Sequence, residues 1–148
     1  MSLKARITED MKAAMRSGEK DRLSCIRMLQ AGIKQREVDE RVELDDTQVL
    51  AVIDKMIKQR KESVAQFQAG NRADLVAKES AEIDVLTGYL PAQLGLPELD
   101  GMIKDAIAAT GAASMKDMGK VMGVLKPKVQ GRTDMGALSA RIKSALGG

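Results

Sequence analysis

The stretch "PAQLGLP", residues 91–97, divides this sequence into two helical parts. Proline fixes its own φ, lacks the amide hydrogen that a helix interior needs, and restricts the residue before it. Two prolines and a glycine within seven residues therefore interrupt any helix. We expect one helical domain over residues 1–91 and a second over residues 92–148.

Apolar residues recur at helical spacing on the N-terminal side of this break. Ser2 is a plausible N-cap for a first helix that Gly18 interrupts. A second apolar stripe covers about residues 20–36. The acidic segment "EVDERVELDD", residues 37–46, is expected to be an exposed connection. The N-terminal part thus begins with two helices and an acidic loop.

Two more helices complete the N-terminal part. Asp45 and Gln48 have the spacing of a capping box, which opens a third helix that reaches about residue 69. Gly70-Asn71 is expected to end that helix and to cap a fourth, which must stop at Pro91.

Three shorter helices are expected after the break. Pro97 suits the first turn of a helix that ends at Gly111. Ser114 and Asp117 have the pattern of another capping box, for a helix that Pro127 stops. Asp134 is expected to cap the last helix. With no strand-like alternation, the sequence predicts an all-α fold: an N-terminal bundle of about four helices, followed by a small C-terminal three-helix bundle.

Composition excludes several functional classes. No segment has the roughly 18 consecutive apolar residues of a membrane-spanning helix, and the N-terminus does not resemble a secretory signal. Cys25 is the only cysteine, so an internal disulfide is impossible. From these features we expect a cytoplasmic protein that does not bind membranes.

The side chains that most catalytic sites use are scarce. The chain has no histidine, which removes Ser-His-Asp and Cys-His catalysis. The acidic run lacks the spacing of a calcium loop, and Gly119-Lys120 lies in no phosphate-loop motif. Cys25 lies on an apolar helical stripe, where an inert thiol is favoured over a nucleophile. No catalytic residue, cofactor site or metal site is identified.

Positive charge is concentrated near the C-terminus. Residues 1–91 have no net charge, whereas residues 112–148 carry a net charge of +5. Such a local excess indicates a polyanionic partner. In "MGKVMGVLKPKVQGR", residues 118–132, Gly119 and Gly123 lie on one helix face. That face suits either close packing of another backbone within the fold or close approach to a ligand.

Two segments resemble the YqeY family, also described as GatB/YqeY-domain proteins. These are "GYLPAQL", residues 88–94, and "MGKVMGVLKPKVQGRTDMGALSARIKSAL", residues 118–146. The helical segment "MKAAMRSGEKDRLSCIRMLQAGIKQREVD", residues 11–39, also fits. The resemblance implies two helical subdomains, the second similar to the tail of the GatB subunit of glutamine-dependent tRNA amidotransferase, where that tail helps to hold tRNA.

Three functional hypotheses follow from the residues and the resemblance. The first is a non-catalytic accessory module that binds tRNA or other folded RNA. The second is a protein-interaction module that docks on an amidotransferase or aminoacyl-tRNA synthetase component through methionine-rich helices. The third is an enzyme, since the family label is carbon–nitrogen ligase with glutamine as amido-N-donor, although no catalytic residues are identifiable. The expected RNA-binding residues are Lys120, Lys126, Lys128, Arg132, Gly119, Gly123 and Gly131.

Overall fold

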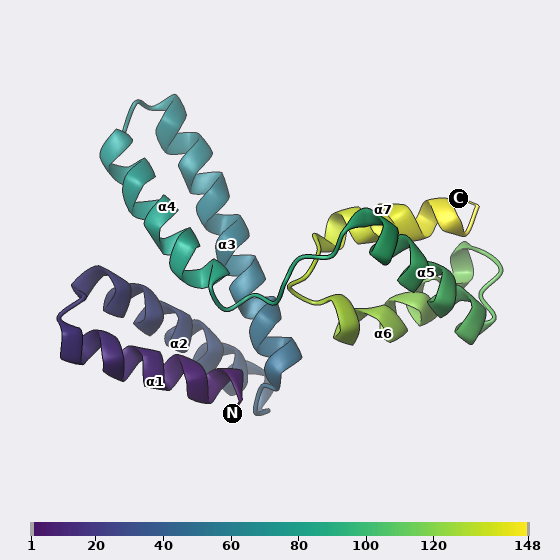
Figure 1. The fold of residues 1–148 in the computed structure, drawn as a ribbon, viewed down its shortest axis with the longest axis horizontal. Helices are drawn as coiled ribbons and strands as arrows, with labels where there is room; N and C mark the ends of the chain where they lie inside the picture. The colour runs from purple at the N-terminus through teal and green to yellow at the C-terminus, as the bar shows by residue number, and fades with distance from the viewer. Residues whose placement is uncertain (1, 148) are drawn as a thin grey trace. The chain divides into compact units, whose positions relative to one another are not determined.

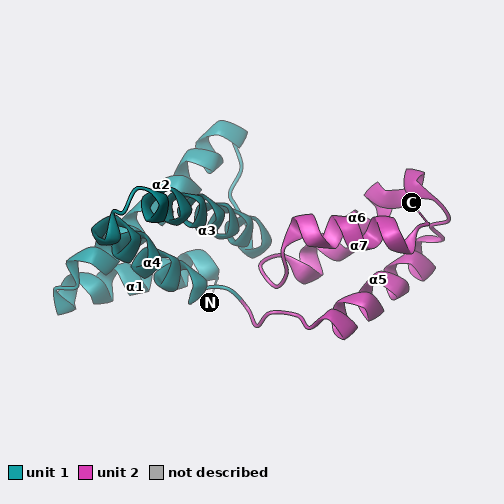
Figure 2. Cartoon of the chain, turned by 90° about the horizontal axis from the view of Figure 1, so that it is seen from above, with its two compact units in different colours: residues 1–90 teal, residues 91–148 magenta. Residues whose placement is uncertain are grey.

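The computed structural model describes residues 2–147, and this part of the chain is helical without a β-strand (Figure 1). The all-α class is therefore confirmed for these residues. The chain divides into two compact units between Leu90 and Pro91 (Figure 2). The first unit contains α1 (Leu3–Ser17), α2 (Lys20–Glu40), α3 (Asp46–Ala69) and α4 (Ala73–Thr87). The second contains α5 (Leu96–Thr110), the 3₁₀ turn η1 (Met115–Asp117), α6 (Met118–Val129) and α7 (Met135–Ala145).

Helix ends in the first unit follow the predicted capping signals. The Ser2 hydroxyl accepts a hydrogen bond from the Ala5 amide at 3.1 Å, which satisfies a donor in the first turn of α1. Gly18 ends α1 with a φ of 74°, a left-handed conformation that glycine adopts without steric cost. Asp45 and Gln48 form the reciprocal capping box at the start of α3.

Apolar faces of all four helices meet in the core of the first unit. Because a helix repeats every 3.6 residues, positions three and four apart bring their side chains to one face. The buried residues of this core are Ile7, Ala14, Cys25, Ile26, Leu29, Ile33, Leu44, Val49, Ile53, Ile57, Leu86 and Tyr89.

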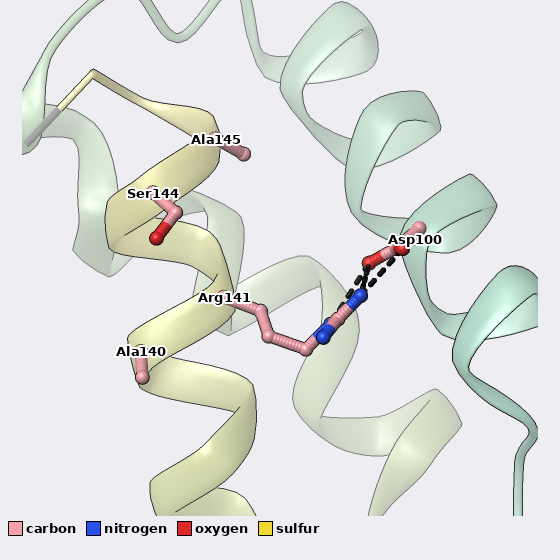
Figure 3. A pocket seen from close by; sticks show the side chains of 5 residues that line it. All are labelled: Asp100, Ala140, Arg141, Ser144 and Ala145. Atoms are coloured by element: carbon pink, nitrogen blue, oxygen red, sulfur yellow. Dashed lines mark hydrogen bonds and ion pairs between the residues drawn. The ribbon is translucent and has the colours of Figure 1, made fainter.

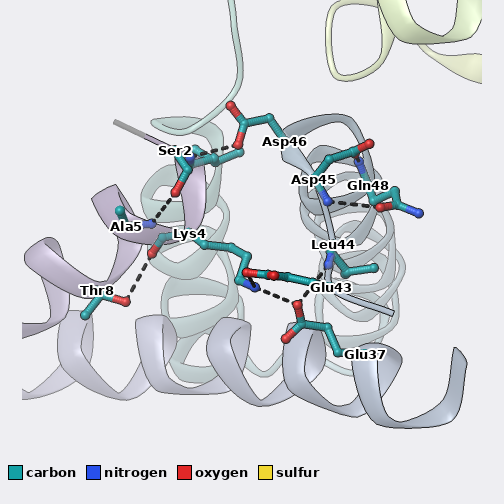
Figure 4. A network of polar contacts seen from close by, with 11 residues as sticks. Ser2, Lys4, Ala5, Thr8, Glu37, Glu43, Leu44, Asp45, Asp46 and Gln48 are labelled. Atoms are coloured by element: carbon teal, nitrogen blue, oxygen red, sulfur yellow. Dashed lines mark hydrogen bonds and ion pairs between the residues drawn. The ribbon is translucent and has the colours of Figure 1, made fainter. Parts of the chain in front are cut away.

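The α2 helix is one turn longer than predicted, because a polar network holds its end (Figure 4). The Glu37 carboxylate accepts a hydrogen bond from Lys4 Nζ at 2.6 Å and another from the Leu44 amide at 2.8 Å. The expected acidic connection from residue 37 is therefore wrong for its first four residues, and the loop occupies residues 41–45.

The predicted ends of α4 are also wrong. Arg72, rather than Asn71, precedes the first helical residue, and its side chain makes no capping bond. At the other end α4 stops at Thr87, before the proline. Tyr89 then turns into the core, with its hydroxyl donating to Asp10 Oδ2 at 2.7 Å. This burial draws the chain out of the helix before Pro91 would force the break.

A second core lies between α5, α6 and α7. Pro97 lies in the first turn of α5, Gly111 ends that helix with a φ of 67°, and Asp134 caps α7 by accepting from the Ala137 amide at 3.0 Å. These three signals are confirmed. The buried residues of this core are Leu99, Ile103, Ala106, Val121, Leu125, Val129, Leu138 and Ile142.

Two predictions for α6 are wrong. Ser114 makes no side-chain capping bond; instead the Asp117 carboxylate accepts from the Ala113 amide at 3.0 Å and stabilises the turn before α6. Pro127 does not stop the helix, which continues to Val129. The last turn is retained because Leu125 and Val129 are buried in the core, and this burial offsets the hydrogen bond that proline cannot make.

Candidate nucleic-acid interface

The α6 helix and the turn after it carry all seven residues expected to bind RNA. Lys120, Lys126 and Lys128 are exposed on α6. Gly131 lies in the turn with a φ of 78°, and Arg132 beside it is half-buried. The exposure of the lysines follows from α6 itself, which turns Val121, Leu125 and Val129 toward the core.

Helical geometry places Lys120 and Lys126 at the two edges of one face of α6. Each residue turns about 100° around the helix axis, so Lys120 and Lys126 lie about 120° apart. Gly123 falls midway between them, about 60° from each. Lys128 lies about 160° from Lys126 and about 80° from Lys120, outside the Lys120 edge of that face. Lys120 and Lys126 therefore flank a face that contains Gly123, whereas Lys128 does not belong to it.

Within the described part of the second unit, residues 91–147, nothing covers the glycines between these lysines. Gly119 and Gly123 are exposed, and a Cβ atom built on either would meet no heavy atom within 4 Å. The interpretation that these glycines let another backbone of the fold pack closely is therefore wrong. We name this surface the α6 glycine face, defined by Gly119 and Gly123 with Lys120 and Lys126 at its edges.

The charges beside the glycine face are largely available to a ligand. Lys120 Nζ lies 3.8 Å from Asp117 Oδ1, and the lysine side chain is 70% exposed. The pKa of Asp117 is lowered, chiefly because its carboxylate accepts the hydrogen bond from the Ala113 amide. Asp117 thus serves mainly to hold the turn. Neither Lys126 nor Lys128 forms an ion pair within residues 2–147.

Arg132 has a structural contact that its sequence position did not reveal. Its Nε donates to the Ala92 carbonyl at 3.0 Å, and its own carbonyl accepts from the Leu94 amide at 2.8 Å. Gln93 Nε2 donates to the Gly131 carbonyl at 2.8 Å. Arg132 therefore connects two distant segments of the second unit. In the sequence, the only indication of this contact is that residues 88–94 and residues 118–146 resemble the same family.

Arg141 contributes little to the positive surface. Its guanidinium reaches from α7 to Asp100 on α5, with Nε 2.8 Å from Oδ1 and a terminal nitrogen bonded to both carboxylate oxygens (Figure 3). This bidentate pair neutralises one of the C-terminal cations and ties α7 to α5.

Two further observations concern reactive side chains in the described part of the chain. Among residues 2–147 no cluster of three or more histidine, cysteine or acidic side chains has the arrangement of a metal site. Cys25 is buried, and burial raises the pKa of its thiol, which disfavours the nucleophilic thiolate.

The methionines divide between the cores and the surface. Met56, Met102, Met118 and Met122 pack against the two cores. Met28 is instead 49% exposed, and Met15 is 52% exposed. The first four methionines therefore fill space beside the cores, whereas Met15 and Met28 lie at the surface.

Comparison with known proteins establishes the family. The model of the family described as "Yqey-like protein" matches residues 4–146, and the chain therefore belongs to the YqeY family. A protein of Pyrenophora tritici-repentis named "Altered inheritance of mitochondria protein 41, mitochondrial" is 34% identical over 146 residues, which cover 96% of this chain and 80% of that protein.

Two further relatives carry the same name. The protein of Kluyveromyces lactis is 31% identical over 142 residues, covering 95% of this chain and 74% of that protein. The protein of Lachancea thermotolerans is 38% identical over 87 residues, covering 58% of this chain and 46% of that protein.

The expectation of a cytoplasmic location is not supported. The relatives are named as mitochondrial proteins. Within residues 2–147, no helix has both the length and the apolar character needed to cross a bilayer.

Proposed function

We propose that this YqeY-family protein is a non-catalytic accessory module that binds folded RNA, with tRNA as the favoured ligand. The α6 glycine face is the observation that carries the proposal. An exposed glycine in a helix costs about 0.5–1 kcal/mol relative to alanine, and among residues 2–147 no heavy atom lies within 4 Å of a Cβ built at position 119 or 123. Close approach of a ligand to the α6 backbone gives both glycines a role.

The charges at the edges of this face support a polyanionic ligand. Lys120 and Lys126 stand on either side of bare helix backbone, where each ammonium group can contact a phosphate. Lys128 and the exposed part of Arg132 extend the positive surface toward the turn after α6. Phosphate contacts of this kind position a nucleic acid without reading its sequence.

Folded RNA suits this surface better than unpaired RNA does. Residues 91–148 contain no aromatic side chain, so bases cannot stack on this unit. Helical RNA presents a wide and shallow minor groove lined by 2′-hydroxyl groups, which proteins recognise largely by shape. At Gly119 and Gly123 no side chain separates the helix backbone from such a groove, and exposed Pro127, about 40° from Gly123, adds only a compact ring to this face. The relationship to tRNA amidotransferase enters through the family resemblance alone.

Charge-matched variants test this proposal in the full-length chain. The triple variant K120A/K126A/K128A removes the three exposed lysines of α6, and K20A/K55A/K61A removes three exposed lysines from the first unit. We expect the α6 variant to bind bulk tRNA at least about tenfold more weakly at 100 mM salt, and the control to bind within about twofold of wild type. Arg132 is left intact because its removal would also disturb residues 92–94.

Equal weakening by both triple variants would attribute binding to net charge alone and contradict the assignment to α6. Unchanged binding by the α6 variant would favour the protein-interaction hypothesis. Half-exposed Met15 and Met28 are then the apolar side chains to replace first. ATP- and glutamine-dependent amide formation by the purified chain would instead support the enzyme hypothesis.

A further inference from the structure

The residues before α5 are held by the turn that follows α6. Ala92, Gln93 and Leu94 form a strap whose three contacts are the Arg132 Nε bond to the Ala92 carbonyl, the Gln93 bond to the Gly131 carbonyl, and the Leu94 amide bond to the Arg132 carbonyl. Leu94 also packs against the second core. In this state the strap belongs to the second unit.

The chain immediately before Pro91 is held just as firmly by the first unit. Tyr89 is buried and donates to Asp10, and the Arg6 guanidinium lies 5.0 Å from the centre of its ring. Arg6 also donates to the Gly88 carbonyl at 3.1 Å. Leu90 packs against the first core, and its amide donates to the Thr87 carbonyl at 3.0 Å.

We infer that the strap is a conformational device that sets the length of free chain between the two units. With the strap docked, these contacts hold every residue from Gly88 to Leu94 except Pro91. Proline fixes its own φ and restricts the residue before it, so this connection is short and stiff. With the strap released, the free chain extends through Leu94 to the start of α5.

Release of the strap requires little disruption of either core. Ala92 and Gln93 are exposed, and only Leu94 contributes apolar contact. Segments with few buried contacts and exposed hydrogen bonds open at lower free energy than the helices beside them. Arg132 controls this opening because its side chain and its carbonyl each hold one end of the strap.

Hydrogen exchange at the Leu94 amide measures strap docking directly. In the full-length wild-type chain we expect this amide to be protected, and in R132A to exchange at least about tenfold faster, since a charge-assisted hydrogen bond is lost. Q93A should accelerate the same amide through loss of the bond to Gly131. The amides of Ile103 and Ile142 report whether the second unit remains folded, and their protection should not change.

The control variant is R141A, which removes the contact of the second arginine described in this unit, the pair with Asp100. It should leave exchange at Leu94 unchanged. ¹⁵N relaxation dispersion gives a second measurement: the exchange contribution of the strap amides on the microsecond–millisecond timescale should be larger in R132A than in wild type.

Three results would overturn the inference. Rapid exchange at Leu94 in the wild-type chain would show that the strap is not docked. Unchanged exchange in both R132A and Q93A would show that these side chains do not hold it. Loss of protection at Ile103 and Ile142 in both variants would show that the strap cannot separate from a folded unit. None of these results depends on RNA binding.

Discussion

Arg60 on α3 and Glu82 on α4 form an ion pair with Nε and Oε2 2.8 Å apart, and their side chains are only 8% and 14% exposed. Removing one partner of a buried pair leaves a charge without compensation, which is far more costly than loss of a surface pair. We expect E82A to lower the free energy of unfolding of the first unit by about 3 kcal/mol, measured by chemical denaturation.

The Arg36–Glu40 pair on α2 gives the control, because both of its side chains are substantially exposed. E40A should change the same free energy by less than about 1 kcal/mol. Replacing both buried partners in R60M/E82L should be less damaging than E82A alone, since no unpaired charge remains. A double variant less stable than E82A would show that the pair itself contributes net stability.

Stability of the first unit should fall in acid through Glu37. Hydrogen bonds from Lys4 and then from the Leu44 amide lower the pKa of this carboxyl below its usual value. A carboxyl with a lowered pKa in the folded state stabilises the fold at pH values above its unfolded pKa of about 4.3, and this contribution is lost as the pH falls through the lowered value. Denaturation midpoints measured from pH 7 to pH 2.5 should show this loss, and E37Q should show a smaller one.

The Lys4–Glu37 contact also makes stability depend on pH in alkaline solution, where stability falls as the pH rises. The Glu37 hydrogen bond is the largest factor that raises the pKa of Lys4. The lysine's contribution to stability is therefore present below its unfolded pKa of about 10.4 and disappears above the raised value.

In the acid experiment, a stability profile of E37Q that runs parallel to that of wild type would assign the loss of stability to other carboxylates.

The glycine face separates stability from function in a single substitution. Gly123 has open space around it, so G123A should raise the free energy of unfolding of the second unit by about 0.5–1 kcal/mol through better helix propensity. It should nevertheless weaken tRNA binding, because the added methyl group holds the ligand away from the α6 backbone.

Gly101 provides the matched control for this substitution. It is an exposed glycine within α5, and a Cβ atom there also meets nothing within 4 Å. G101A should give a similar gain in stability with no change in tRNA binding. If G123A and G101A bind tRNA equally well, the glycine face has no role in RNA recognition.

Pro127 should be a destabilising residue within α6. The helix continues past it to Val129, so the Gly123 carbonyl lacks the amide hydrogen that residue 127 would normally supply. P127A restores this donor and should raise the thermal midpoint of the second unit, with a gain of up to about 3 kcal/mol. A lower midpoint would indicate that the proline conformation is needed for packing near the end of α6.

Local signals in the sequence predicted most of the helix boundaries. Ser2, Asp45 and Asp134 cap helices in the structure as their side chains predicted, because each bond joins residues only three positions apart. Gly18 and Gly111 end helices with positive φ values, which also depends on the residue itself. These features require no knowledge of the rest of the fold.

The structural features that could not be predicted from the sequence depend on contacts between residues far apart in the chain. The extra turn of α2 depends on Lys4, which lies 33 positions from Glu37. The role of Arg132 depends on Ala92, which lies 40 positions away. The lysines of α6 were predicted as RNA-binding residues, but their directions depend on Pro127 lying inside the helix. Helical spacing then separated Lys128 from Lys126.

The salt dependence of tRNA binding tests most directly whether α6 contacts phosphates. The logarithm of the association constant, measured for wild type and for K120A/K126A/K128A between 50 and 300 mM salt, should fall linearly with the logarithm of salt concentration, with a slope of about −0.7 to −0.9 for each phosphate contact. Three lost contacts should make the slope of the variant shallower by about 2 to 3, while K20A/K55A/K61A keeps the wild-type slope. Identical slopes for wild type and the α6 variant would contradict the proposed interface.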